Sequence, residues 1–143
     1  MSPPSIPTGD CTHSCAEQNS ANYTVNGHEP CVINTKDATE LGIKHGEIVR
    51  VYNDRGQILA GAKATDAIRP GAARVSEGGW YDPAEPSKTG TLSEYGDVNV
   101  LSMDVGPSKL GQDNCGDSIC GEVENYKDPA VTVDVFTAPN SAD

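Results

Sequence analysis

Residues 37–65 read DATELGIKHGEIVRVYNDRGQILAGAKAT, and this stretch decides the fold class. Its central run, residues 45–53, is rich in β-branched side chains and predicts a strand. Asp54-Arg55-Gly56 then supplies a turn, and residues 57–65 predict a second strand. Two strands joined by so short a turn predict a β-hairpin.

Short elements are predicted on both sides of this hairpin. Upstream, residues 29–34 predict a buried strand. Thr35 or Asp37 is expected to cap a short helix that runs through Leu41, and Gly42 is placed to end it in a left-handed conformation. Downstream, further strands are expected at residues 72–76, 99–103, 119–126 and 130–136, with polar loops at 78–91 and 106–116.

The composition agrees with a β-rich fold. The chain of 143 residues contains 15 glycines and 10 prolines, which favour turns and leave little room for long helices. Its length suits one domain. Six or seven short strands with one or two small helices predict a compact barrel. We expect a lead-in at residues 1–20, the barrel at 21–137 and a disordered tail at 138–143.

Charge and hydropathy exclude two classes of partner. There are 21 acidic and 10 basic residues, and the resulting net charge of −11 repels nucleic-acid phosphates. No stretch approaches the roughly 20 apolar residues that cross a bilayer, so no membrane partner is expected. The first ten residues, MSPPSIPTGD, lack the basic and apolar regions of a signal peptide, so the chain as written predicts cytoplasmic expression.

The five cysteines leave the redox compartment open. They are Cys11, Cys15, Cys31, Cys115 and Cys120. The two short-spaced pairs, at 11/15 and 115/120, are compatible with small disulfides or with free thiols, and the sequence fixes no connectivity. Cys11 and Cys15 also flank His13, but this spacing is not that of a standard zinc site, so no metal ligand is predicted.

Five segments, taken in order, carry a resemblance to a known family. They are residues 37–65, residues 77–83 (EGGWYDP), residues 95–101 (YGDVNVL), Ser108-Lys109-Leu110 with Gln112, and residues 122–126 (EVENY). Together they resemble the C-terminal molybdopterin-dinucleotide-binding domain of the dimethyl sulfoxide, trimethylamine N-oxide and biotin sulfoxide reductases, which are molybdenum oxidoreductases. The fold that this resemblance implies is a double-psi β-barrel with one or two short helices.

The resemblance also implies a set of cofactor-binding residues: His13, Ser14, Asp97, Asn99, Ser108, Lys109 and Gln112. Asp97 and Asn99 are expected to contact a purine or sugar, and Gln112 can both donate and accept hydrogen bonds. Ser108 and Lys109, between Gly106 and Gly111, are expected to form an anion-binding loop. His13 and Ser14 are expected against the pterin.

Each assignment has a structural alternative. Asp97 and Asn99 are also common turn residues, Lys109 alone resembles a solvated lysine, and His13 alone resembles a surface imidazole. Trp80 and Tyr81 suit either stacking on a ligand or anchoring a loop.

The function implied is that of the C-terminal domain or fragment of a bacterial S- or N-oxide reductase, such as trimethylamine N-oxide reductase. Such a domain contributes one wall of the bis-molybdopterin guanine dinucleotide (bis-MGD) site, and its partners are the remaining domains of the parent enzyme. No catalytic residue is predicted, and the chain alone is expected to be inactive and to bind the cofactor weakly or not at all. The parent family is periplasmic. The alternative is a stand-alone small barrel that lost the cofactor and serves as a structural or protein-interaction module.

Overall fold

The structure is a computed structural model, and it describes residues 24–76, 79–102, 109–110, 120–128 and 133. These residues form mostly strands: β1 (Pro30–Asn34), β2 (Ile48–Tyr52), β3 (Gln57–Thr65), β4 (Ala73–Val75), β5 (Leu92–Ser93) and β6 (Glu122–Asn125). Two short helices accompany them in this part of the chain, α3 (Thr35–Glu40) and the 3₁₀ helix η2 (Val98–Leu101). The prediction of a mainly β fold with one or two short helices is confirmed.

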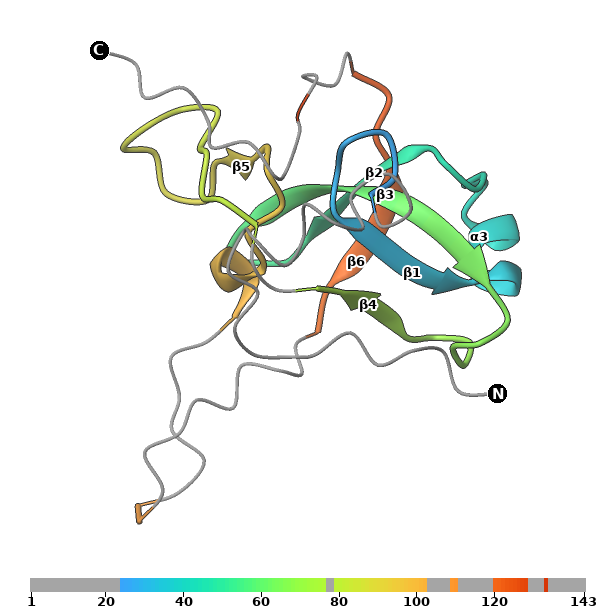
Figure 1. The fold of residues 1–143 in the computed structure, drawn as a ribbon. Coiled ribbons are helices and arrows are strands. Elements are labelled where there is room, and N and C mark those ends of the chain that lie inside the picture. Colours follow the sequence, from blue (N-terminus) through green and yellow to red (C-terminus); the bar gives the residue numbers. More distant parts are fainter. Residues whose placement is uncertain (1–23, 77–78, 103–108, 111–119, 129–132, 134–143) are drawn as a thin grey trace.

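All six strands belong to one sheet in which β3 has three neighbours (Figure 1). The sheet order is β4-β1-β3-β2-β6, and β5 pairs with β3 off this path. The predicted hairpin is the antiparallel pair β2–β3, which runs in register from Ile48 opposite Gly61 to Tyr52 opposite Gln57. Strand β1 pairs with β3 in parallel, and β6 pairs antiparallel with β2. Residues far apart in the sequence therefore meet on both sides of the hairpin.

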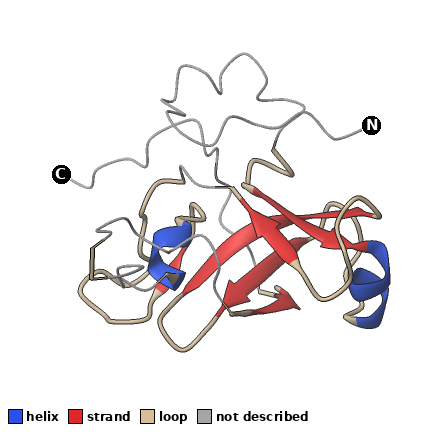
Figure 2. Ribbon diagram, turned by 90° about the horizontal axis from the view of Figure 1, so that it is seen from below, coloured by secondary structure: helices blue, strands red, loops and turns tan. Residues whose placement is uncertain are grey.

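The two helices lie at opposite ends of the sheet (Figure 2). The prediction that Thr35 or Asp37 caps the first of them is wrong, because the N-cap is Asn34, whose Oδ1 accepts from Lys36 N at 2.9 Å. The Asp37 carboxylate instead accepts from Gly71 N at 2.6 Å, which ties the helix to the turn before β4. Gly42 follows the helix with a φ of 68°, the left-handed conformation that was expected.

Three strand predictions need correction or lie outside the described residues. Residues 45–53 form a shorter strand than predicted, because Gly46 has a φ of 93° and the extended run begins only at Ile48. The strand predicted at 99–103 is wrong, since η2 occupies residues 98–101. Of the strand predicted at 130–136 only Val133 is described, and it is buried.

The core lies around β3 and its neighbours. Val49 and Val51 from β2, Ile58 from β3 and Ile33 from β1 are all less than a tenth exposed. Five consecutive residues of β3, from Ile58 to Ala62, are buried, so both faces of this strand are covered. A larger residue at position 61 would clash, because a Cβ built on Gly61 would overlap the Cβ of Val25.

The double-psi barrel stays a prediction. The strand pairings among the described residues run from β4 to β6 and include no pairing between these two that would close the sheet. The boundaries predicted for the lead-in and the tail, at residues 20 and 138, also lie outside the described residues. Within the part that the structure describes, no helix has the length and apolar character to span a membrane.

Replacement of Asn34 by alanine is expected to destabilise the chain by about 1–3 kcal/mol. The substitution removes the cap of α3 and also the bond from Asn34 Nδ2 to Ile68 O, which is 2.7 Å long. Asn34→Ser keeps an oxygen that can cap the helix, so it should lose less. The measurement is chemical denaturation followed by circular dichroism. Glu40→Ala, at an exposed position of the same helix, is the control, and equal losses in Asn34→Ala and this control would contradict the expectation.

Cys31 and Cys120 are expected to react very differently with iodoacetamide. Cys31 is fully buried, and burial raises the pKa of its thiol from 9.0 to about 12, whereas Cys120 is exposed. Only the thiolate is nucleophilic, so at pH 8 about one Cys31 in ten thousand would be reactive even if reagent reached it. Peptide mass spectrometry should find Cys120 alkylated and Cys31 intact until guanidinium is added. Equal labelling of the two in the folded chain would show that β1 is not in the core.

Candidate functional site

Two of the predicted site residues, Asp97 and Asn99, lie at one short helix. Asp97 is the N-cap of η2, and its Oδ1 accepts from Asn99 N at 3.0 Å. Asn99 is exposed, and its side-chain amide makes no hydrogen bond to any other residue that the structure describes. The Asp97 carboxylate is therefore partly occupied in holding the helix, which agrees with its structural alternative. The Asn99 amide is available to a ligand.

The helix η2 is held against the sheet by its last residues. Leu101 is 1% exposed and belongs to the core. Gly56, in the hairpin turn, lies so close that a Cβ built there would be 2.7 Å from Val100 O. Ser102 closes the helix, since its N and Oγ both donate to Asn99 O, at 3.2 and 3.0 Å. The exposed amide of Asn99 thus stands on a firmly anchored turn.

A second family segment packs against the turn before η2. A Cβ built on Gly79 would lie 2.8 Å from Gly96 O and from Tyr95 O, so the two backbones are in direct contact. Gly96 itself has a φ of 81° and lies over Leu59 O, with only 3.0 Å left for a Cβ. Both glycines are needed for this approach. The structure therefore brings residues 79–83, the described part of one family segment, against the start of the segment 95–101.

Trp80 and Tyr81 follow directly after this contact. Their exposed fractions are 38% and 56%, which is high for aromatic side chains. The exposed rings and the exposed Asn99 amide thus belong to two segments whose backbones are in contact at Gly79 and Gly96. Side chains of these two kinds suit the face and edge of a purine base better than they suit an aliphatic ligand.

The same region is acidic. Glu94 N donates to Asp82 O at 3.0 Å, so the two residues lie side by side. Burial, and secondly the nearby Asp82 carboxylate, raise the pKa of the Glu94 carboxyl above its usual value. Asp97 follows three residues further along the chain, and Lys88, the one basic residue among residues 79–102, is paired with Glu85. This electrostatic setting disfavours a phosphate at the same place.

The remaining predicted residues are not brought to η2 by the described structure. Lys109 is exposed, and the short segment 109–110, orange in Figure 1, stands well apart from η2 and the sheet. Leu110 beside it is 98% exposed. The shared groove expected between the loops at 95–101 and around Lys109 is thus not formed by the described residues. His13, Ser14, Ser108 and Gln112 lie outside them.

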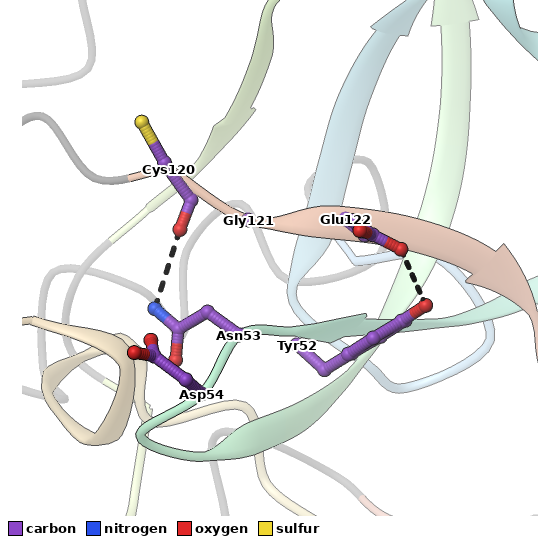
Figure 3. A pocket seen from close by; sticks show the side chains of 6 residues that line it. All are labelled: Tyr52, Asn53, Asp54, Cys120, Gly121 and Glu122. Atoms are coloured by element: carbon purple, nitrogen blue, oxygen red, sulfur yellow. Dashed lines mark hydrogen bonds between the residues drawn. The ribbon is translucent and has the colours of Figure 1, made fainter.

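The structure also has an open depression that the sequence did not reveal. Its volume is about 520 Å³, and it is lined by Tyr52, Asn53, Asp54, Cys120, Gly121 and Glu122 (Figure 3). Tyr52 OH donates to Glu122 Oε2 at 2.7 Å, and this bond raises the pKa of the tyrosine. The Cys120 thiol points away from this pair. Only the pairing of β2 with β6 creates the depression, so no local sequence signal could have found it.

No candidate metal centre is present in the described part of the chain. No group of three or more His, Cys, Asp and Glu side chains gathers there in a way that could hold an ion. The segment from Cys11 to Cys15 lies outside the described residues.

Comparisons with known proteins place the chain in a family. Residues 6–114 match the family described as "Molydopterin dinucleotide binding domain". A dimethyl sulfoxide/trimethylamine N-oxide reductase of Cereibacter sphaeroides is 60% identical over 120 residues, which are 84% of this chain and 15% of that protein. A trimethylamine-N-oxide reductase of Salmonella typhimurium is 45% identical over 117 residues, 82% of this chain and 14% of that protein. This chain therefore spans only about 15% of the length of these relatives.

A solved structure supports the fold. Acetylene hydratase from Pelobacter acetylenicus superposes with a TM-score of 0.59 over 81% of this chain and 16% of that one, at 17% sequence identity. At this identity the likeness concerns the fold alone. The family match covers most of the chain and confirms the resemblance that the ordered motifs indicated. The chain belongs to the molybdopterin dinucleotide binding domain family.

Proposed function

We propose that this chain is the C-terminal part of an S- or N-oxide reductase, where it forms one wall of the bis-MGD site without being catalytic itself. The observation that carries the proposal is the family match, together with relatives named as dimethyl sulfoxide and trimethylamine N-oxide reductases that are several times longer. The partners of the chain are then the other domains of the same enzyme. A periplasmic location follows from this assignment.

The described residues fit the nucleoside end of such a cofactor. Asn99 offers an exposed amide to a guanine edge or ribose hydroxyl, and Trp80 and Tyr81 offer exposed rings on the segment that packs against the turn before η2. Gly79 and Gly96 allow the backbones of these two segments to touch, because neither carries a Cβ. When bound, the molybdenum and its pterin dithiolenes supply the redox chemistry. The role of this chain is to orient the nucleotide.

The pyrophosphate is assigned to a different part of the chain. The carboxylates of Asp82, Glu94 and Asp97 oppose an anion beside η2. We therefore assign the pyrophosphate to Ser108, Lys109 and Gln112, and the pterin to His13 and Ser14. The net charge of −11 does not prevent this, because salt screens charges beyond roughly 8 Å and local donors decide.

The proposal is tested by a chimera in which this chain replaces the matching segment of the Cereibacter sphaeroides reductase. The purified chimera should contain molybdenum and release GMP on acid hydrolysis. Asn99→Ala should speed the loss of cofactor about tenfold, since one hydrogen bond of about 1.4 kcal/mol is removed. Cofactor loss is followed at a fixed temperature by the GMP in the filtrate.

Glu40→Ala, on α3 at the opposite end of the sheet, is the matched control and should behave like the unsubstituted chimera. A folded chimera that contains neither molybdenum nor guanine nucleotide would refute the proposal. That result would favour a structural or protein-interaction module.

The purified chain alone is expected to show no reduction of trimethylamine N-oxide by a reduced viologen dye. It should also bind free GMP only weakly, because the rest of the cleft is missing and few contacts must offset the entropic cost of association. Spectrophotometric turnover and isothermal titration calorimetry are the measurements. Measurable turnover, or a dissociation constant below about 1 μM, would show that the chain is a self-sufficient site.

A further inference from the structure

We propose that Asn53 is a positioning residue for the cofactor, which acts by fixing η2 so that the Asn99 amide faces the nucleotide. The inference rests on the proposed function and deepens it. Asn53 itself lies in the hairpin turn after β2 and, in this proposal, does not touch the cofactor.

The Asn53 side chain joins three segments that are distant in sequence. Its Nδ2 donates to Leu101 O at 2.8 Å, at the end of η2, and to Cys120 O at 3.4 Å, just before β6. Its Oδ1 accepts from Arg55 N at 2.9 Å and from Gly56 N at 3.2 Å, within the hairpin turn. One side chain therefore connects the turn, the helix and the residue before β6, and Figure 3 shows the last of these links, from Asn53 to Cys120.

Only asparagine meets all four demands at this length. A carboxamide carries two N–H donors and one oxygen with two lone pairs, and all four are used here. Aspartate would keep the two acceptor bonds and lose both donors, while presenting a negative charge to two carbonyl oxygens. Alanine would lose all four bonds. A comparison of Asn53→Asp with Asn53→Ala therefore distinguishes the effect of losing the bonds to Leu101 and Cys120 from the effect of also losing the bonds within the turn.

The link is positioned to control Asn99. Leu101 is buried, so its carbonyl has no easy alternative partner in water. Asn99 stands two residues earlier in the same short helix, and Val100 between them is pressed against Gly56 of the same turn. A shift of the Leu101 carbonyl must therefore move or loosen the backbone that carries the Asn99 amide.

Asp54 provides a matched control in the same turn. It is exposed and lines the depression beside Asn53, and its side chain makes no hydrogen bond to another described residue. Asp54→Ala changes the same turn without touching the link to η2.

The first experiment measures amide hydrogen exchange by NMR in the chain itself. Asn53→Asp should speed exchange at Val100 and Ser102, whose amides are bonded within η2, by tenfold or more. Exchange at Gly61 in β3 should stay within threefold, and Asp54→Ala should leave all three sites unchanged. Unchanged exchange in η2, or an equal rise at Gly61, would overturn the proposal. If Asn53→Ala unfolds the chain, Asn53→Asp still decides the question.

The second experiment is a double-mutant cycle on cofactor loss in the reductase chimera. Asn53→Asp should speed the loss about tenfold, and in the Asn99→Ala background the same substitution should add less than threefold. A merely structural role would give the same factor in both backgrounds, and that result would overturn the proposal. So would an Asn99→Ala chimera that keeps its cofactor normally, although the proposed function would then stand. A folded chimera without guanine nucleotide would refute both.

Discussion

Strand β3 is the constraint on which the rest of the structure depends. It pairs with β1 and β5 in parallel and with β2 antiparallel, and its residues 58–62 are buried on both faces. A strand covered on every side has no room for large residues at its crowded points, which explains the run Ala60-Gly61-Ala62. Strands β1 and β6, which are distant in sequence, are joined through this strand and its hairpin partner β2. A substitution that shifted β3 would therefore also move β1, β5 and the hairpin turn that contacts η2.

Local structure followed from the sequence where it depends on neighbours in the chain. The hairpin, the strand at 57–65 and the left-handed Gly42 are set by β-branched residues and by turn chemistry, and all were predicted. The strand predicted at 99–103 failed because the side chain of Asp97 caps a helix there, and this capping competes with the β preference of the valines. The parallel pairing of β1 with β3 and the position of β6 had no local signal, since both depend on contacts between residues distant in sequence.

In the candidate site, too, some features could be predicted from neighbouring residues in the chain, and others depend on contacts between distant ones. Asp97 and Asn99 could be named from the order of the motifs, but their different roles could not. Whether a carboxylate caps a helix or faces a ligand depends on the local backbone dihedral angles. These angles depend in turn on the contacts that η2 makes with the hairpin turn and the sheet. Asn53 is one of the residues that hold η2, yet it belongs to the hairpin turn and carries no chemistry that would single it out in the sequence. It becomes visible only when the atoms that its carboxamide bonds are known.

The charges on the described surface favour separate binding sites for the nucleoside and the pyrophosphate of the cofactor. A guanosine group is uncharged and gains from amides and aromatic rings, and in the proposed function the exposed Asn99 amide and Trp80 ring would supply these. A pyrophosphate carries negative charge and would be repelled there. The two parts of one dinucleotide therefore need different surroundings, and a single uniform pocket would not serve both. Under the proposed function, this separation would reconcile the net charge of −11 with an anionic cofactor, because the surface at η2 would receive the uncharged nucleoside and donors elsewhere would bind the pyrophosphate.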